Sequence, residues 1–329
     1  MAYHPQDFAF TFLSILFEGV PFLLIGTMLS GWIDVYLPGR TIENLLPRNR
    51  VLAVITSALL GLVIPMCECT AVPVMRRLVL KGFPVACAVT YILASPVVNP
   101  VSIFNTYQAF YRPDPWFMVG SRFGLTVVLA SLVGLVLLKV PVRHYLNPRV
   151  MRSILEQSGQ AFFGGRGKED GATAPSPAKR SGLTPSEGGR LVAAARTSTR
   201  DFLDVLVYFA AGAMLATIFK ESILYSQVER LSERPFWATP VLMIFSFVSS
   251  LCSSSDALII AQFNFPYGPR LAFLVYGPMF DFKLVFLYLT FFQRWFIAVL
   301  GASMFVVVWM ITWNWTDLVW PLYFRLTGS

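Results

Sequence analysis

The stretch Pro65-Met66-Cys67-Glu68-Cys69-Thr70-Ala71-Val72-Pro73 interrupts an apolar segment that covers residues 51–80. A second apolar segment, residues 236–262, is interrupted by Ser249-Ser250-Leu251-Cys252-Ser253-Ser254-Ser255-Asp256. Inside a bilayer, irregular backbone is tolerated only where protein or a water-filled cavity covers it. The two interruptions therefore predict broken helices inside a membrane protein, with thiol and hydroxyl groups at the breaks.

The composition supports a chain embedded in a membrane. Of the 329 residues, 56% are hydrophobic and 13% are charged, whereas soluble domains carry about 25% charged residues. So little charge excludes an ordinary soluble enzyme, a disordered protein and a disulfide-rich secreted domain. We expect an all-α polytopic membrane protein with about eight hydrophobic segments. Besides the two interrupted segments, these are residues 8–33, 83–110, 116–138, 200–222, 270–292 and 295–316.

The net charge of +8 does not indicate nucleic-acid binding, because the basic residues lie in loops between the apolar runs, where they orient a membrane protein. The first run contains Glu18 and lacks a basic flank, so we expect a first transmembrane helix rather than a signal peptide. His4 and His144 lie outside the runs, which excludes a histidine-rich metal site in the membrane. Without a nucleotide motif, we expect no cofactor, no ATP-powered transport and no enzymatic activity.

The chain divides into two halves that resemble each other. We expect a first transmembrane repeat at 1–140, a basic cytoplasmic loop at 141–198 with a disordered linker at 156–190, and a second transmembrane repeat at 199–329. The acid and the Gly-x-Met-Leu pattern of residues 18–29 recur in residues 204–215, and Cys67, Pro84 and Asn99 align with Cys252, Pro269 and Asp281.

The repeats are expected to be inverted. If each interrupted segment forms a re-entrant hairpin, each half crosses the bilayer three times, and more basic residues fall on the cytoplasmic side. The alternative is that both interrupted segments cross completely, which gives eight crossings. The hairpin arrangement places both termini outside the cell, and the alternative places both inside.

The cysteines at the first interruption predict a site for a soft solute or metal. On a regular helix, Cys67 and Cys69 would point about 200° apart, but an extended backbone at the start of a half-helix could aim both at one ligand. Thiolates suit soft metals and metalloids. We therefore take Cys67 and Cys69 as candidate metal or solute ligands, with Glu68 beside them and Cys252 opposite. Cys87 has the simpler interpretation of a small apolar core residue.

Further polar residues within the apolar runs complete the candidate site. Ser95 and Asn99 would form a polar wall of a substrate path, although a proline kink with local hydrogen bonds is the alternative. Ser253 and Ser254 would contact the substrate, as part of the hydroxyl-rich segment 249–256, which could instead cap a half-helix through Ser255 or Asp256. Acids at membrane depth usually face a cavity or a partner. The candidates for coupling transport to protons are Glu18, Asp204 and Asp281, with an Asp281–Lys283 ion pair as the structural alternative.

The C-x-C-x-x-x-P pattern at Cys67, Cys69 and Pro73 and the stretch Ala94-Ser95-Pro96-x-x-Asn99-Pro100 together resemble a family of predicted permeases. This family includes the trivalent organoarsenical efflux permeases (ArsP-like). The second half carries matching residues: Cys252, Ser253, Ser254, Gly277, Pro278, Asp281 and Lys283.

The resemblance implies a multi-pass permease of the bacterial inner membrane that exports trivalent organoarsenicals, with Cys67 and Cys69, together with Cys252, as the binding thiols. Its partners would be a small solute and the lipid bilayer, with a homo-oligomer left open.

Three alternatives stay open. Because Glu68 favours a cation, the solute could be a divalent or soft metal ion. Half-helix N-termini could instead hold a small sulfur-containing or organic anion. The thiol pair could also belong to a membrane thiol oxidoreductase, since two neighbouring thiols can cycle through a disulfide.

Overall fold

The computed structural model describes residues 5–36, 47, 49–64, 66–111, 115–148, 151–152, 198–199, 202–203, 205–215, 217, 235–253, 255–263, 265–313 and 315. The linker expected at 156–190 lies outside these residues, as do Asp204 and Ser254. The backbone of Glu18 is described and its side chain is not.

The described part of the chain is helical and contains no strand beyond one isolated bridge between Leu146 and Phe292, which confirms the all-α class. The first half contains α1 (Pro5–Tyr36), α3 (Arg50–Leu59), η1 (Leu60–Leu62), α4 (Glu68–Leu80), α5 (Val85–Ala94), α6 (Pro100–Ala109), α7 (Pro115–Lys139) and η2 (Val142–His144). The second half contains α11 (Pro235–Ser249), α12 (Asp256–Ala261), α13 (Tyr267–Met279), α14 (Phe282–Leu289) and α15 (Arg294–Trp313).

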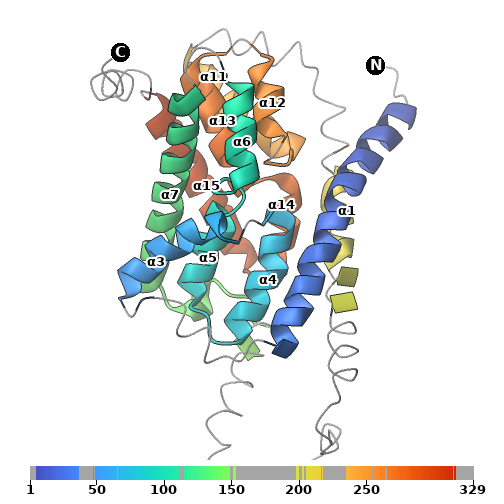
Figure 1. Ribbon diagram of the computed structural model, residues 1–329, viewed down its shortest axis with the longest axis vertical. Coiled ribbons are helices and arrows are strands. Elements are labelled where there is room, and N and C mark those ends of the chain that lie inside the picture. The colour runs from blue at the N-terminus through green and yellow to red at the C-terminus, as the bar shows by residue number, and fades with distance from the viewer. Residues whose placement is uncertain are drawn as a thin grey trace, which may run out of the picture.

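The first interrupted segment turns back on itself. In Figure 1, α3 rises from the lower end of the molecule to its middle, and α4 descends from the middle to the lower end. Arg50 at the start of α3 and Pro84 after the end of α4 line one cavity, so the segment begins and ends on the same side. Helices α11 and α12 occupy the opposite, upper end (Figure 1).

Two further helix pairs connect the ends of the molecule through breaks at its middle. Helix α5 starts beside the lower cavity, and Phe110 after α6 packs its ring against Arg270, 5.8 Å away near the start of α13. Conversely, the side-chain amide of Asn147, beyond the lower end of α7, donates to the carbonyl of Leu289 at the end of α14. The chain therefore crosses upward through α5 and α6 and downward through α13 and α14.

The runs at 83–110 and 270–292, expected as membrane spans that their prolines break or kink, are each broken in the structure. Asn99 has an extended backbone, and its side chain accepts a hydrogen bond from the Val101 amide, 3.0 Å away, which starts α6. Asp281 is likewise extended, and its Oδ1 accepts from the Leu284 amide at 2.7 Å. A side-chain cap satisfies the amide that a helix start would otherwise leave without a partner. Both breaks are therefore built helix starts rather than kinks.

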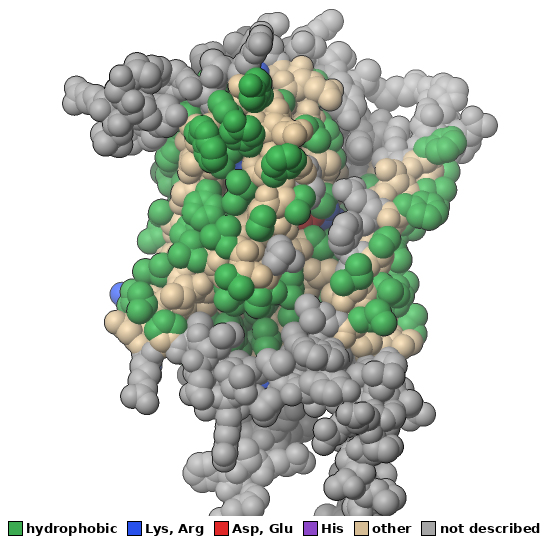
Figure 2. Space-filling view, in the orientation of Figure 1, with side chains coloured by type: hydrophobic (Ala, Val, Ile, Leu, Met, Phe, Trp, Pro, Cys, Tyr) green, Lys and Arg blue, Asp and Glu red, His purple; other side chains and the backbone are tan. Residues whose placement is uncertain are grey.

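Among the described residues, three segments are long and apolar enough to cross a membrane by length and composition: Pro115–Lys139, Tyr267–Leu289 and Arg294–Trp313. In an apolar 18-residue window of each, 83% of the residues are buried in the middle segment and 44% and 39% in the outer two, so α13 and α14 form the centre of the bundle. Figure 2 shows that hydrophobic side chains cover most of the visible face between the ends, with few charged groups. Such a surface fits lipid and not water.

Candidate functional site

The break between α3 and α4, called the first break from here on, places two thiols at the start of α4; the break between α11 and α12, at Cys252, is called the second break. Cys67 has an extended backbone (φ −78°, ψ 164°) and directly precedes the helix, while Cys69 is its second residue. This change of backbone direction removes the divergence that a continuous helix would impose, and both thiols line the same small cavity. Cys69 is buried and Cys67 is partly exposed. The pair could therefore hold one ligand between two sulfur atoms.

The break at Cys67 and the break at Cys252 share one hydrogen-bond pattern. The Cys67 carbonyl accepts bonds from the amides of Thr70 and Ala71, at 3.2 and 3.1 Å, and from the Thr70 hydroxyl at 3.1 Å. The Cys252 carbonyl accepts from the amides of Ser255 and Asp256, at 2.9 and 3.0 Å, and from the Ser255 hydroxyl at 3.2 Å. Each cysteine thus starts a helical turn in the same way.

The residues that follow these cysteines touch each other across the centre of the molecule. The Ser253 hydroxyl donates to Oε2 of Glu68 at 3.5 Å, although 185 positions separate the two residues. Both side chains are buried. The sequence positions one step beyond Cys67 and Cys252 therefore meet at the same point.

Lys283, from α14, is the cation of this centre. Its Nζ lies 3.0 Å from Oε1 of Glu68 and 3.5 Å from Oδ2 of Asp281, and it donates to the Ser250 carbonyl at 2.9 Å. Side chains two apart do not face each other on a helix, but Asp281 is an extended cap, which lets it reach Lys283. The ammonium also interacts electrostatically with Cys69 and Cys252. One lysine therefore links both breaks.

A second buried ion pair lies beside the break at Cys252. Nη2 of Arg122, from α7, lies 2.6 Å from Oδ2 of Asp256, and Nη1 donates to the Thr106 hydroxyl at 2.6 Å. The Ser253 carbonyl accepts a bond from the Ser102 hydroxyl at 3.1 Å. Both charged side chains are almost fully buried. This pair attaches the second break to α6 and α7 of the first half.

The thiols, Glu68 and Lys283 surround a small internal cavity. It has a volume of about 20 Å³, which is room for about one water molecule, so the structure holds the site closed. Its lining residues come from α1, from both breaks, from α14 and from the segment 205–215. They are Ile15, Gly19, Cys67, Glu68, Cys69, Phe209, Ser250, Cys252 and Lys283.

The structure brings together some of the residues that the sequence singled out. Cys67, Glu68, Cys69 and Cys252 line the cavity, and Ser253 contacts Glu68. Asp281 contacts Lys283 and does not line the cavity.

Ser95 and Asn99 also lie off the cavity wall, because Ser95 ends α5 and Asn99 caps α6. Ser254, Asp204 and the side chain of Glu18 fall outside the described residues, although Gly19, next to Glu18, lines the cavity.

The roles of two central cations were underestimated from the sequence. Lys283 was considered only as a partner for Asp281, whereas it also pairs with Glu68, 215 positions away. Arg122 lies in a long apolar run, and its pairing with Asp256 was not predicted. A signal was available in the sequence: each break carries an acid at membrane depth, and Arg122 and Lys283 are basic residues that lie well inside apolar runs, at least six residues from either end.

No group of three or more histidine, cysteine, aspartate or glutamate side chains with metal-binding geometry occurs among the described residues. None of the described cysteines, Cys67, Cys69, Cys87 and Cys252, forms a disulfide. The arrangement at the first break is thus a two-thiol site beside an ammonium group.

Comparison with known proteins gives two relatives and one family. A family described as "Predicted permease" matches residues 5–313. The chain is 32% identical over 300 residues to UPF0718 protein YcgR of Bacillus subtilis, covering 90% of this chain and 92% of that protein. It is 25% identical over 300 residues to a Streptococcus mutans protein named as a subunit of a two-component membrane permease complex, covering 90% and 91%. No solved structure matches.

Proposed function

Because the chain belongs to the family of predicted permeases, we propose that it exports a soft, thiol-reactive solute such as a trivalent organoarsenical across the bacterial inner membrane. The observation that carries the proposal is the adjacent pair of free thiols at Cys67 and Cys69 on the wall of a buried cavity. Thiol sulfur is a soft ligand, and soft metals and metalloids prefer it to oxygen or nitrogen.

The proposed binding chemistry is ligand exchange. A monosubstituted trivalent arsenical carries two exchangeable hydroxyl groups. The thiols of Cys67 and Cys69 would each form one arsenic–sulfur bond, and two water molecules would leave, with arsenic remaining trivalent. The Lys283 ammonium and the N-terminus of α4 lie beside the thiols, where their positive charge would stabilise negative charge that develops on sulfur, and the Cys252 thiol lies on the same cavity wall. Return of two water molecules would release the solute on the other side.

Alternating access would follow from an inverted repeat. Two features support this arrangement: the shared hydrogen-bond pattern at Cys67 and Cys252, and the matching caps at Asn99 and Asp281. In the described residues, the order of the helices after the first break, α4 to α7, parallels that of α12 to α15. Breaks that meet at the middle of the membrane are typical of transporters built from inverted repeats. Opening of the 20 Å³ cavity to either side would admit a solute larger than water.

The ion pair between Asp281 and Lys283 would couple this motion to proton flow. Exchange of a proton at Asp281 would weaken its contact with Lys283, 3.5 Å away, and so free the ammonium that links the breaks. Glu18 and Asp204 are further coupling candidates, and Gly19 on the cavity wall places the backbone of Glu18 beside the site. The lower end of the molecule, with Arg50, Arg76 and Lys139, would face the cytoplasm, since cytoplasmic ends carry the basic excess.

One specific observation favours a second candidate, a small sulfur-containing or organic anion. The cavity wall carries an ammonium, and helices α4 and α14 begin beside it, so an anion would meet a positive field. The cysteines would then be apolar contacts for sulfur rather than bonding partners. This candidate predicts transport that survives replacement of either thiol.

The test is uptake of a trivalent methylated arsenical into everted membrane vesicles. Cys67→Ser and Cys69→Ser should each abolish uptake, and Cys87→Ser, a thiol outside this cavity, should leave it unchanged. Uptake that survives Cys67→Ser combined with Cys69→Ser would overturn the thiol mechanism. Wild-type vesicles that accumulate a small sulfur anion and no arsenical would replace the proposal with the second candidate.

A further inference from the structure

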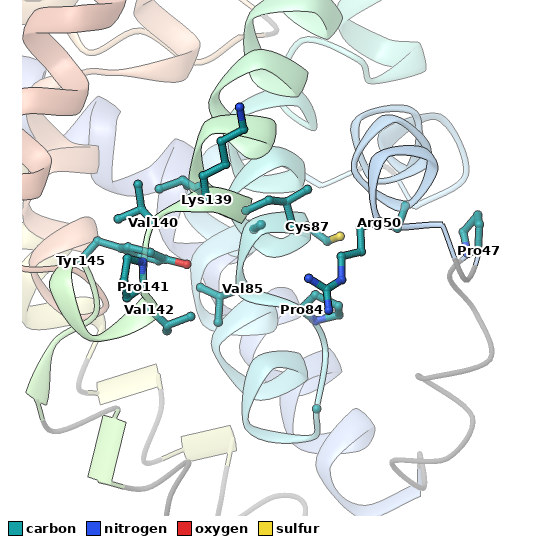
Figure 3. Close-up of a pocket in the computed structure, with 15 residues that line it drawn as sticks. Pro47, Arg50, Pro84, Val85, Cys87, Lys139, Val140, Pro141, Val142 and Tyr145 are labelled. Atoms are coloured by element: carbon teal, nitrogen blue, oxygen red, sulfur yellow. The ribbon is translucent and has the colours of Figure 1, made fainter.

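A larger cavity of about 660 Å³ lies at the lower end of the bundle, between the ends of α3, α5 and α7. Ligand pockets in proteins commonly measure about 300–1,000 Å³. It shares no lining residue with the thiol cavity. Figure 3 shows Arg50, Cys87 and Tyr145 converging on it from separate segments. The proposed transport mechanism makes no use of this space.

The inner wall of this cavity is apolar. Ala53, Ala86, Cys87 and Leu137 are buried there, and the partly exposed Val85 lies beside them. The wall is thus a hydrophobic surface that extends inward from the helix ends. A small, fully hydrated anion such as free phosphate would gain nothing from such a surface.

The rim of the cavity carries two cations. Arg50 is the first residue of α3, and Lys139 is the last residue of α7. Both are exposed, and among the described residues no aspartate or glutamate lines the cavity. Helix α7 has 25 residues and so spans about 37 Å, more than the roughly 30 Å hydrocarbon core. Its last residue therefore reaches the level of lipid headgroups.

Tyr145 supplies a hydrogen-bond donor at the same level. Its ring is buried against Phe296, with ring centres 5.3 Å apart, and its hydroxyl points toward the other labelled residues in Figure 3. Burial raises the pKa of this hydroxyl to about 12, so it keeps its proton at neutral pH. It can therefore donate to a phosphate oxygen.

We propose that this cavity binds an anionic phospholipid of the adjacent leaflet. The phosphate would lie beside Arg50, within reach of Lys139 once that side chain turns from its direction in Figure 3, and an acyl chain would cover Val85 and Leu137. Apolar wall, cationic rim and headgroup depth are the three properties that such a lipid needs, and basic pockets between transmembrane helices bind anionic headgroups in this manner. The proposal concerns a structural lipid and does not depend on the transported solute.

The experiment measures lipid binding to the purified full-length protein by native mass spectrometry and by thermal unfolding in detergent. Phosphatidylglycerol should bind and raise the melting temperature more than phosphatidylcholine. Glycerol phosphate at the same concentration should do neither, which separates a lipid from its free headgroup. Arg50→Gln should weaken phosphatidylglycerol binding about fivefold, the effect of one basic side chain at an anionic surface, and Arg50→Gln with Lys139→Gln about thirtyfold.

Two further variants make the result decisive. Arg76→Gln removes a charge from the same end of the molecule without touching the cavity, so it should leave lipid binding unchanged. Val85→Trp should fill the cavity and reduce binding of both lipids. Equal binding of the two lipids, or an Arg76 effect as large as that of Arg50, would overturn the proposal. A purified protein that binds glycerol phosphate as tightly as phosphatidylglycerol would do so as well.

Discussion

The two breaks use the same backbone design for different side chains. At both, a cysteine carbonyl accepts bonds from two amides and one hydroxyl, which starts a helical turn. The first break then presents Glu68 and a second thiol to a cavity, facing the single ammonium of Lys283. At the second, Asp256 is held by Arg122, whose guanidinium is fixed by Thr106 and lies off the cavity.

This difference indicates that Lys283 and Arg122 have different roles, the first in motion and the second in holding the structure together. A lysine is a flexible point charge that can change partners, whereas a guanidinium held at several nitrogens is fixed in direction. The first break is therefore suited to bind and release, and the second is suited to hold the two halves together. Substitutions in the two ion pairs test this distinction, beginning with Arg122, which anchors Asp256.

Removal of the anchor should have the largest effect. Arg122→Leu leaves Asp256 buried without its cation, which should cost about 3–5 kcal/mol of stability. Thermal unfolding in detergent measures this loss. Adding Asp256→Leu to Arg122→Leu should recover most of it, because a buried pair can be replaced by apolar residues. A double variant as unstable as the single one would contradict the role of a simple anchor.

Lys283→Met should also destabilise the protein and should have a larger effect on transport. It leaves Glu68 and Asp281 buried without their cation, so the loss of stability should be of the same order, about 3 kcal/mol. Vesicle uptake should nevertheless disappear, since the link between the breaks is gone. An Lys283→Met protein that transports normally would show that this cation is structural, like Arg122.

The helix caps Asn99 and Asp281 should differ in the same way, the first affecting stability and the second affecting transport. Asn99→Ala removes the cap of α6 away from the cavity, so it should cost about 1 kcal/mol and leave transport intact. Asp281→Asn keeps an oxygen for the Leu284 amide and removes the charge beside Lys283, so it should change stability little and reduce transport. Transport assays of both variants at equal expression compare them directly.

The shared backbone pattern predicts the smallest and most equal effects. Thr70→Val and Ser255→Ala each remove one hydroxyl bond to a cysteine carbonyl, worth about 0.5–1.5 kcal/mol. If the two breaks are equivalent in construction, the two losses should agree within about 0.5 kcal/mol. A loss confined to one break would indicate that the resemblance is superficial.

The fold was largely predictable from where polar residues interrupt apolar runs. Prolines and capping residues such as Asn99 act locally, so their effect on a helix can be predicted from the sequence. The alignment of Cys67 with Cys252 proved informative because it fell on residues with the same backbone role.

The ion-pair partners on distant helices could not be predicted from the local sequence. Arg122 and Asp256 are 134 positions apart, and nothing local selects one acid for one base. Likewise, Ser95 and Asn99 looked like a substrate wall because polar residues at membrane depth suggest one, whereas Asn99 satisfies a nearby backbone amide and neither side chain lines the cavity. The assignment of polar residues to a site or to a cap requires the packing of the helices.

The most direct test of the thiol site is alkylation of each cysteine by a membrane-permeant maleimide, read by mass spectrometry of wild-type protein in vesicles. A trivalent methylated arsenical should protect Cys67 and Cys69 together and leave Cys87, outside the cavity, labelled as before. Labelling of Cys67 and Cys69 that is indifferent to the arsenical would contradict the central claim that this thiol pair holds the solute.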